Sequence, residues 1–402
     1  MSRAGATAGG DVGLVVLADH WGRHPSSAQH LVRRLLDRYR VSWINTVGTR
    51  RPQLTVADAG RVLGYLKESF FGSKVEAGAA TDGPEVVSPV MLPGFRSGWQ
   101  RALNRRAMAR AIRRSAAGRC RQTVGLTTLP ITADLVGMTG VDRWIYYAVD
   151  DFSVWPGLDH EVMASMEREL VGKVDRVVAV SETLRDRMRT FGGAGAEADL
   201  LTHGIELEPW RRPRQRARWP ELETDESVLL FWGVIDRRLD VGWCRRLASM
   251  GRLVLAGPEQ DPPAALAAID GVVRLGKVAY EDLPSLAKQA DVLVMPYADL
   301  PVTRAMQPLK FKEYLATGQP VVARALPGIA GWSDAAWLVG DEASMEAAVL
   351  QGLTAGIPAS QVAARERLSG EGWDTKAAWL DVVIRGVIGQ RSDDEGVLSR
   401  AA

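Results

Sequence analysis

The stretch Ala305–Arg324, AMQPLKFKEYLATGQPVVAR, places a cation and a carboxylate three residues apart at the start of a predicted helix. Pro308 stands just inside the predicted helix start and Gly318 just past its end, before a short apolar strand. Backbone N–H groups at a helix start attract anions, and Lys310 adds a full positive charge. Glu313 lies on the same face and can accept hydrogen bonds from hydroxyl groups. The pattern favours an anion site suited to a diphosphate, but taken alone it is more often an ordinary surface ion pair.

A second candidate follows the apolar run SVLLFWGV, which predicts a buried strand. Gly233 would let the backbone approach a ligand closely. Arg237 or Arg238 would then supply a guanidinium for a phosphate group. The alternative is a solvated arginine pair after a glycine that serves only packing.

The third candidate lies in WIYYAVDDFSVWPG, where Asp150 and Asp151 come directly after a predicted strand. Ligands of open α/β sheets bind beyond the carboxyl ends of strands, so either carboxylate could act as a general base. The segment Asp150–Ser153 could equally cap the following helix. The two aspartates can also divide these roles.

The fourth candidate is the loop DHWGRHPSSAQHL, which predicts a cleft edge lined by His20, Arg23, His24 and Ser26, with Ser27 as the helix cap. This loop is not a dinucleotide-binding GxGxxG, and no Walker lysine follows it, which argues against a dehydrogenase and an NTPase. None of the five histidines pairs with a glutamate at zinc-ligand spacing. We therefore expect no metal site and no cofactor.

Length and composition indicate a two-domain protein of the cytoplasm. A chain of 402 residues exceeds one ordinary core. Cys120 and Cys244 are far apart, so they form neither a metal cluster nor a disulfide framework. The first residues, MSRAGATAGGDVG, contain no apolar core of a secretory signal, and no apolar run is long enough for a membrane span.

The order of apolar and amphipathic runs predicts two parallel α/β sheets. Short β-like runs alternate with helical patterns, and the alternation restarts after a segment rich in proline and charge. We predict an α/β fold with two Rossmann-like domains that face a cleft. The predicted boundaries are residues 1–205 for an N-terminal domain, 206–226 for a linker, 227–371 for a C-terminal domain, 372–388 for a crossover helix and 389–402 for a flexible tail.

The net charge of +2 is unevenly spread. Residues 1–205 contain 27 Lys and Arg against 21 Asp and Glu, whereas the remainder contains 23 against 27. The segment Gly94–Gln122 holds nine arginines and no acidic residue, and its apolar residues recur at near-helical spacing. It therefore predicts a basic amphipathic surface helix. Because the second half is acidic and no binding motif accompanies the patch, we expect no nucleic-acid partner.

Taken together, these segments resemble the two-domain GT-B glycosyltransferases of bacterial cell-surface glycan and glycolipid synthesis, with a group 1/4-like C-terminal domain. The resemblance is closest over Leu275–Arg324 and good at FWGVIDRRLD. It extends to YYAVDDFSVWPG, DRVVAVSETL and THGIE, and is weak over residues 48–125. It implies a hexosyltransferase whose N-terminal domain binds the acceptor and whose C-terminal domain binds a nucleotide-diphosphate sugar, as a UDP- or GDP-sugar.

The resemblance also implies roles for individual residues. Arg238 and Lys310 would hold the diphosphate, Arg304 would contact phosphate or sugar, and Glu313 would bind ribose or sugar hydroxyls. The start of the helix at Pro308 and Leu309 would supply backbone N–H groups, and residues 276–280 would border the nucleobase.

Two features leave the reaction open. Many relatives carry a second glutamate eight positions before Glu313, where this chain has Ala305, so the identity of the donor sugar is not carried over. Asp150 lies where some inverting relatives place a catalytic base, and retaining relatives need none. The alternatives are a sugar-nucleotide epimerase on the same fold and an inactive GT-B binding subunit.

The expected reaction displaces a nucleoside diphosphate from an anomeric carbon by a hydroxyl of a glycan, lipid-linked or small-molecule acceptor. Fixed cations would stabilise the leaving group without an essential metal. Arg96–Arg121 would contact an anionic membrane surface and receive a lipid-linked acceptor, or would form a merely solvated helix. We expect a cytoplasmic protein, peripheral at the inner face of the plasma membrane.

Overall fold

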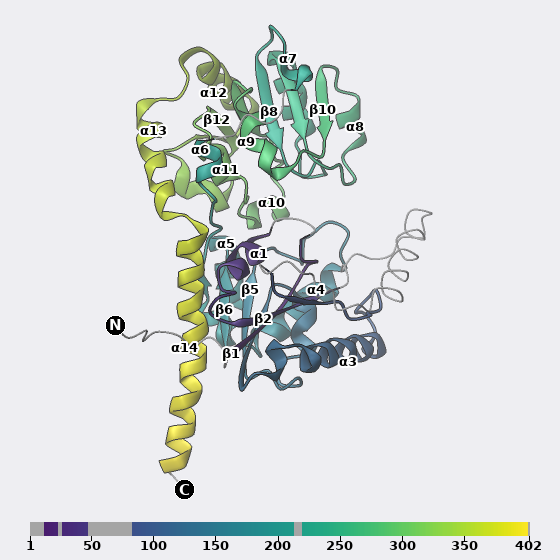
Figure 1. The fold of residues 1–402 in the computed structure, drawn as a ribbon. Coiled ribbons are helices and arrows are strands. Elements are labelled where there is room, and N and C mark those ends of the chain that lie inside the picture. Colours follow the sequence, from purple (N-terminus) through teal and green to yellow (C-terminus); the bar gives the residue numbers. More distant parts are fainter. Residues whose placement is uncertain (1–11, 23–25, 47–82, 213–218, 401–402) are drawn as a thin grey trace, which may run out of the picture. The chain divides into compact units, whose positions relative to one another are not determined.

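The computed structural model describes residues 12–22, 26–46, 83–212 and 219–400 (Figure 1). The chain divides into two compact units. Met1–Thr202 and Trp373–Ala402 make up the first, and His203–Gly372 the second. Each unit contains one parallel sheet with helices packed against it, which confirms the predicted α/β class.

The sheet of the first unit has the strand order β3-β2-β1-β4-β5-β6-β7, and every neighbouring pair is parallel. The interior strand β1 (Val12–Ala18) is fully apolar and buried from Leu14 to Leu17, as expected for a strand covered on both faces. The strands are β1 (Val12–Ala18), β2 (Arg40–Asn45), β3 (Glu85–Val87), β4 (Gln122–Thr127), β5 (Arg143–Ala148), β6 (Arg176–Ala179) and β7 (Asp199–Leu200).

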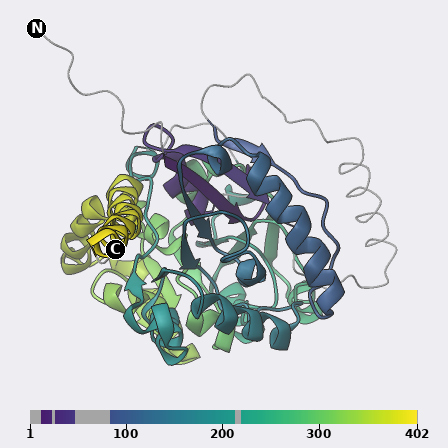
Figure 2. The same cartoon turned by 90° about the horizontal axis from the view of Figure 1, so that it is seen from below.

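Helices cover both faces of this sheet, and Figure 2 shows α3 and α14 on opposite sides of it. They are α1 (Ser27–Arg33), α3 (Gly98–Arg114), α4 (His160–Val171), α5 (Glu182–Thr190) and α14 (Trp373–Arg400), with the short 3₁₀ turns η1 (Ala117–Arg119), η2 (Pro130–Asp134) and η3 (Gly193–Glu197). Helix α3 is the predicted basic helix, and its bounds fall inside Gly94–Gln122.

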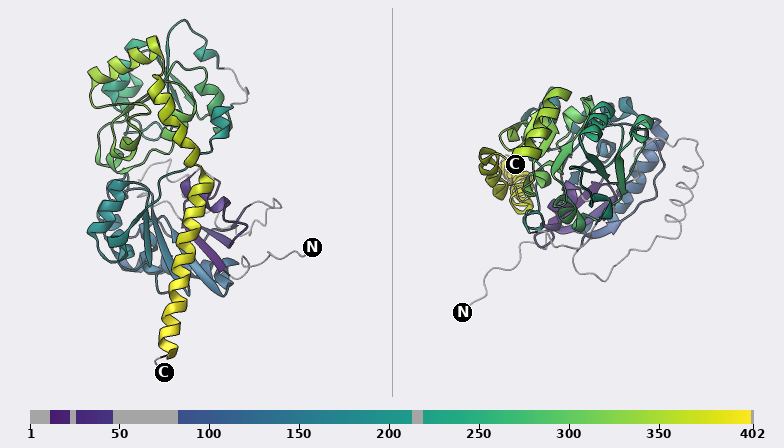
Figure 3. Two further views of the ribbon diagram at one scale, coloured as in Figure 1. Left: turned by 90° about the vertical axis from the view of Figure 1, so that its left-hand side faces the viewer. Right: turned by 90° about the horizontal axis from the view of Figure 1, so that it is seen from above.

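Helix α14 returns the chain to the first unit, where it packs along α1 (Figure 3). The ring of His30 stacks on Trp373 with centroids 4.7 Å apart. Asp381, which is 5% exposed, accepts a 2.6 Å hydrogen bond from the Tyr39 hydroxyl and pairs with Arg38 at 2.8 Å. These buried polar contacts fix the position of the helix on its own unit.

The helical backbone extends further than the sequence pattern indicated. We predicted a helix over 372–388 and a tail over 389–402, whereas α14 continues to Arg400. No proline interrupts Trp373–Arg400, so each turn can continue the hydrogen-bond ladder past the last apolar residues.

The sheet of the second unit has the order β10-β9-β8-β11-β12-β13 and is also parallel throughout. The order reverses between β8 and β11, which is the switch point where open α/β sheets bind ligands. The strands are β8 (Val228–Trp232), β9 (Arg252–Ala256), β10 (Val272–Gly276), β11 (Val292–Met295), β12 (Val321–Arg324) and β13 (Trp337–Val339).

Helices α7 and α12 pack together against the strands of this sheet. Helix α9 connects β10 to β11, and α11 connects β11 to β12. By the right-handed crossover rule, both connections lie on the face of the sheet opposite to α7. The helices are α6 (Glu208–Arg211), α7 (Val241–Met250), α8 (Ala264–Ala267), α9 (Leu283–Ala287), α10 (Pro301–Ala305), α11 (Phe311–Ala316), α12 (Glu342–Ala355) and α13 (Ala359–Arg365), with turns η4 (Pro220–Leu222), η5 (Tyr280–Asp282), η6 (Pro327–Trp332) and η7 (Glu366–Gly370).

The segment predicted as a linker contributes to the core of the second unit. Within 206–226, Trp210 on α6 is only 1% exposed and stacks on Trp232. Proline and charge around it gave the segment the composition of a linker, but one large aromatic side chain is enough to anchor it by burial. The unit boundary accordingly lies earlier in the chain, between Thr202 and His203.

No helix in the described ranges combines the length and the apolar character required to cross a bilayer.

Candidate functional site

The carboxyl edge of the second sheet is lined by glycines at three neighbouring strand ends. The Gly233 N–H donates to the Ala256 oxygen at 2.9 Å, and the Gly257 N–H donates to the Gly276 oxygen at 2.7 Å. A Cβ at Gly257 would come within 1.8 Å of the Gly233 oxygen, and the residue has a φ of +151°. Only glycine satisfies both conditions, so bare backbone forms this part of the edge.

Lys310 lies directly against this backbone. A Cβ at Gly233 would be 1.6 Å from the Lys310 Nζ, so the ammonium group takes the space that a side chain would fill. The Nζ also lies 4.8 Å from the ring centroid of Phe231 and 5.6 Å from that of Tyr297. Among the described residues no carboxylate forms an ion pair with it. The aromatic faces hold the cation in place, and its charge is left for an anion.

Arg238 approaches the same tyrosine ring, with its guanidinium carbon 6.0 Å from the Tyr297 centroid. Asp236 fixes it: the Arg238 Nε lies 3.0 Å from both carboxylate oxygens of Asp236, and the Arg238 backbone N–H donates to one of them at 2.9 Å. The structure therefore brings Arg238 and Lys310 to one ring. Sequence reasoning did not assign a role to Asp236.

Arg237 and Arg304 lie on the surface. Arg237 is 67% exposed and pairs with Asp261 at 2.9 Å. Arg304 is 62% exposed and forms a two-pronged pair with Asp299, at 2.5 and 2.6 Å. Of the two arginines in the RR pair, the half-buried Arg238 is the one that the fold orients toward Tyr297.

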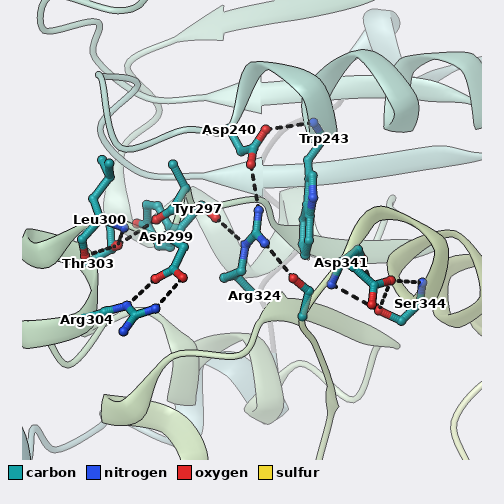
Figure 4. A network of polar contacts seen from close by, with 12 residues as sticks. Asp240, Trp243, Tyr297, Asp299, Leu300, Thr303, Arg304, Arg324, Asp341 and Ser344 are labelled. Carbon is teal, nitrogen blue, oxygen red and sulfur yellow. Dashed lines mark hydrogen bonds and ion pairs between the residues drawn. The ribbon is translucent and has the colours of Figure 1, made fainter.

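Arg324 joins three loops of this edge (Figure 4). Its guanidinium donates to the Tyr297 oxygen at 2.9 Å, the Gly340 oxygen at 2.8 Å and the Asp240 carboxylate at 2.6 Å. It also stacks on Trp243 at 3.6 Å. Because Tyr297 is the ring shared by Lys310 and Arg238, Arg324 fixes the frame for both cations. In the sequence, Arg324 is the charged residue that ends an otherwise apolar strand. This position could have identified it, but the sequence analysis did not assign it a role.

Glu313 is buried, with 8% of its surface exposed. Its Oε1 accepts a 2.8 Å hydrogen bond from the Tyr280 hydroxyl, and its Oε2 accepts one of 3.4 Å from the Trp232 indole. Burial raises the pKa of Glu313 to about 7, against the opposing effect of these donors and of Lys310. Lys310 and Glu313 do not form the ion pair that their spacing favoured, although the Lys310 charge still acts to lower the pKa of the carboxyl.

The predicted helix start at Pro308 is not observed. Helix α11 begins at Phe311 and has six residues, with Lys310 as its N-cap. Pro308 has no N–H to donate, and its oxygen accepts the N–H of Phe311 at 3.1 Å. Leu309 belongs to the preceding turn. The backbone N–H groups predicted at Pro308 and Leu309 are therefore not those of a helix start, and the charged side chains of Lys310 and Arg238 are the remaining candidates for anion binding.

In the first unit, the two aspartates after β5 differ. Asp151 is buried, and its Oδ1 accepts hydrogen bonds from the Ser153 N–H at 3.0 Å and hydroxyl at 2.5 Å. Its other oxygen lies 3.6 Å from Arg187, which also pairs with the fully buried Glu167 at 3.0 Å. Asp151 thus closes a local turn. The predicted helix cap is wrong, because the next helix, α4, has Asp159 as its N-cap. Asp150 is half-buried.

The loop after β1 is partly described. His20 is half-buried, and its backbone oxygen accepts from the Gln29 side chain at 3.4 Å. Ser26 caps α1, since its hydroxyl accepts the Gln29 N–H at 3.4 Å, whereas the predicted cap, Ser27, is buried within the helix. Arg23 and His24 lie outside the described residues. In the described ranges, no three His, Cys, Asp or Glu residues form a group that could hold a metal ion.

Comparison with known proteins shows what the second unit and the overall fold are similar to. Residues 243–355 match the family model for glycosyl transferases group 1. Among solved structures, the sucrose-phosphate synthase of Thermosynechococcus elongatus superposes with a TM-score of 0.69 at 15% identity, over 94% of this chain and 99% of the other. This chain has the GT-B fold and carries a group 1 glycosyltransferase domain. The predicted assignment to the GT-B glycosyltransferases is thereby confirmed.

Two further comparisons concern a structure solved with a bound nucleotide and a protein assigned to a biosynthetic pathway. The Anabaena protein HepE, solved with UDP and glucose, has a TM-score of 0.62 at 13% identity, over 93% of this chain and 99% of its own. A Bacillus subtilis protein assigned to teichuronic acid biosynthesis as a glycosyltransferase, TuaH, is 26% identical over 176 residues. That match covers 42% of this chain and 44% of the relative, so it spans less than half of either.

The buried Glu313 generates a prediction about stability and pH. Its folded pKa, about 7, lies above the ordinary value of 4.5. The stability associated with a raised carboxyl pKa is fully present below about 4.5 and is lost as pH rises through 7. The side chain of Glu313→Gln does not titrate. The free energy of unfolding of wild type should therefore fall by up to about 3 kcal/mol relative to this variant between pH 4.5 and 8.

Urea unfolding at several pH values measures this difference in the free energy of unfolding. Glu281→Gln, at an exposed position, is the control, and a pH-independent difference for Glu313→Gln would contradict the prediction.

Proposed function

We propose that this protein transfers a sugar from a nucleotide-diphosphate sugar to a hydroxyl of a glycan, lipid-linked or small-molecule acceptor. The observation that carries the proposal is the convergence of Lys310 and Arg238 on Tyr297, beside the bare backbone of Gly233. Two fixed cations at a switch point of a parallel sheet fit a diphosphate. The UDP found in the Anabaena structure supports a UDP-sugar as the first donor to test, with a GDP-sugar as the other candidate.

The chemistry follows from where charge develops. As the anomeric carbon leaves the nucleoside diphosphate, negative charge grows on the leaving oxygens and positive character on the sugar ring. Lys310 and Arg238 would stabilise that charge more in the transition state than in the ground state, because they are already oriented by Phe231, Tyr297 and Asp236. Since these side chains supply the positive charge, we propose that no metal is essential.

Asp150 is our proposed general base for the acceptor hydroxyl. Its neighbour Asp151 is committed to Ser153 and Arg187 and serves to shape the loop. A base in this role makes the reaction inverting, whereas a retaining transferase would do without it.

An exposed face of helix α3 is our proposed contact with an anionic membrane surface. Trp99 is 61% and Leu103 44% exposed, and Arg106, Arg110 and Arg113 continue the same face at spacings of three and four residues. Among the described residues none of these three arginines forms an ion pair or a hydrogen bond. An amphipathic aromatic side chain with free arginines fits the interface of an anionic bilayer.

Two other arginines of the segment, Arg96 and Arg101, pair with carboxylates of the first unit. Arg101 pairs with Asp134 at 2.8 Å and Glu169 at 2.7 Å, and Arg96 pairs with Asp159 at 2.9 Å. We therefore assign the membrane contact to the exposed face from Trp99 to Arg113 and not to the whole range Arg96–Arg121. We propose a cytoplasmic enzyme, peripheral at the inner face of the plasma membrane, that meets a lipid-linked acceptor there.

The donor site is tested by Lys310→Ala. Loss of one charged partner of the diphosphate should weaken UDP-sugar or GDP-sugar binding by about 10–100-fold. Isothermal titration with both nucleotide series measures this. Lys288→Ala is the matched control, because the Nζ of Lys288 donates only to the Thr317 backbone oxygen, and its affinity should equal that of wild type. Unchanged affinity in Lys310→Ala would show that the diphosphate is held elsewhere.

The catalytic base is tested by Asp150→Asn. Turnover should fall by about 100-fold or more while the donor affinity stays as in wild type. Asp151→Asn should instead lower the unfolding temperature, since it breaks the turn and the contact with Arg187. Full turnover in Asp150→Asn would show that Asp150 is not the general base and would favour a retaining reaction.

Incubation with donor alone separates the alternatives: an epimerase converts the donor sugar, an inactive subunit only binds it, and a transferase only hydrolyses it slowly.

The membrane face is tested by flotation with vesicles of phosphatidylglycerol and phosphatidylcholine. Reversing Arg106 and Arg110 to Glu should reduce binding at low salt by at least about tenfold. Reversing Arg40 and Arg189, exposed arginines elsewhere in the same unit, is the control for net charge. Trp99→Ala should weaken binding at both low and high salt. If the wild type fails to float even at low salt, the solvated-helix interpretation holds.

A further inference from the structure

The turn that carries Lys310 is anchored on both sides of that residue by the backbone of His203. His203 is the first residue of the second unit and is buried, with 7% of its surface exposed. Its N–H donates to the Oε1 of Gln307 at 2.6 Å, and its backbone oxygen accepts a hydrogen bond from the Nζ of Lys312. Gln307 precedes Lys310 in the chain and Lys312 follows it, so both bonds restrain the backbone around the proposed diphosphate cation.

Lys312 also contacts the segment through which the chain leaves the second unit. Its ammonium group donates to the carboxylate of Glu371, which precedes the last residue of the unit, Gly372. The Ile205 N–H donates to the Glu371 backbone oxygen at 3.0 Å, and Ile205 pairs with Gly372 in an isolated parallel bridge. These two connecting segments, residues 203–205 and 371–372, are therefore adjacent within the second unit, and one ammonium group binds both.

The position of Lys312 brings no advantage to the stability of α11. Lys312 is the second residue of this helix and is only 4% exposed. A cation in the first turn of a helix opposes the helix dipole, and burial of an ammonium group carries a desolvation cost that an apolar side chain avoids. What a lysine adds is three N–H donors at the end of a long side chain. The two oxygens that it binds therefore account for a lysine at this buried position.

Helix α11 is too short to fix the turn by itself. It has six residues, and helices of this length are unstable in isolation. The Lys310 Nζ lies over the rings of Phe231 and Tyr297, which restrains the ammonium group but not the backbone of residues 307–312. The hydrogen bonds to the two connecting segments add a restraint on that backbone.

We propose that Gln307 and Lys312 are positioning residues that tie the turn carrying Lys310 to both connecting segments, so that a nucleoside diphosphate bound by Lys310 also stabilises these segments. The proposal rests on the proposed function, because it assumes that the diphosphate of a nucleotide sugar binds Lys310. The coupling is reciprocal by thermodynamic linkage. Loss of the tie should therefore weaken nucleotide binding and also loosen the connecting segments.

Hydrogen–deuterium exchange of the full chain, with and without UDP-glucose, measures the stability of the connecting segments. The hydrogen bonds of the His203 and Ile205 N–H groups must open before these amides exchange. In wild type, bound nucleotide sugar should slow exchange in peptides that contain His203 and Ile205 by at least about threefold. GDP-mannose is the second probe, and isothermal titration measures the affinity for both.

Gln307→Leu removes the acceptor of the His203 N–H without changing a charge. Exchange at His203 should become faster in the free protein, and nucleotide sugar should no longer slow it. The affinity should fall by about 3–10-fold, because Lys310 is less well oriented. A residue with only a packing role would leave the ratio between the bound and free exchange rates as in wild type.

The tie through Lys312 is tested by combining Lys312→Met with Glu371→Gln, which leaves no unpaired charge at the buried position. This double variant should lose the slowing of exchange at Ile205. Lys312→Arg keeps N–H donors for both oxygens and should restore the slowing. Lys288→Met is the matched control, because the Lys288 Nζ also donates to a backbone oxygen of the second unit, that of Thr317, and it should retain the slowing seen in wild type.

The outcomes separate this proposal from the proposed function. If a nucleotide sugar binds to wild type but leaves exchange at His203 and Ile205 unchanged, the coupling is absent and the proposed function stands. Slowing that persists in both Gln307→Leu and the double variant would equally overturn the proposal. If neither UDP-glucose nor GDP-mannose binds, the proposed function is overturned, and this proposal with it.

Discussion

The candidate site depends on the position of one ammonium group. The Lys310 Nζ occupies the volume that any side chain at Gly233 would need, and the faces of Phe231 and Tyr297 flank it. The ion pair with Glu313 that the spacing suggested would have neutralised the charge. Instead the structure buries the carboxylate among aromatic donors and leaves the cation oriented by rings. A full positive charge therefore remains at the carboxyl edge of the sheet, where an anionic leaving group can use it.

Other residues of the second unit hold Lys310 and its neighbours in position. Arg324 binds backbone oxygens of two loops and the Asp240 carboxylate, so it fixes Tyr297 relative to the loop that carries Arg238. Glycines remove side chains from the backbone that faces the cations. The aromatic cluster around Trp232 holds the Glu313 carboxylate in place. Rigid scaffolding of this kind is what electrostatic stabilisation requires, because dipoles and charges that must reorganise lose their advantage.

In the first unit, residues that look alike in the sequence differ in the contacts that they form. Its basic helix divides into arginines that pair with carboxylates of the fold and arginines that remain exposed beside Trp99 and Leu103. Only the second group can act on an external surface. The two aspartates after β5 divide in the same way, since Asp151 is spent on the loop and on Arg187. In both cases residues that are equivalent in the sequence acquire separate roles through their partners.

The sequence by itself determined the two parallel sheets, most strand positions, the basic helix and the GT-B assignment, because these depend on local periodicity and on the order of segments. It did not determine that α11 starts at Phe311, three residues after Pro308. It also did not determine that Trp210, in the segment predicted as a linker, is buried. It also did not reveal Asp236, Arg324 or the donors to Glu313. Tertiary structure decided these because each is a contact between strand ends far apart in the chain, and no local pattern encodes which partners will meet there.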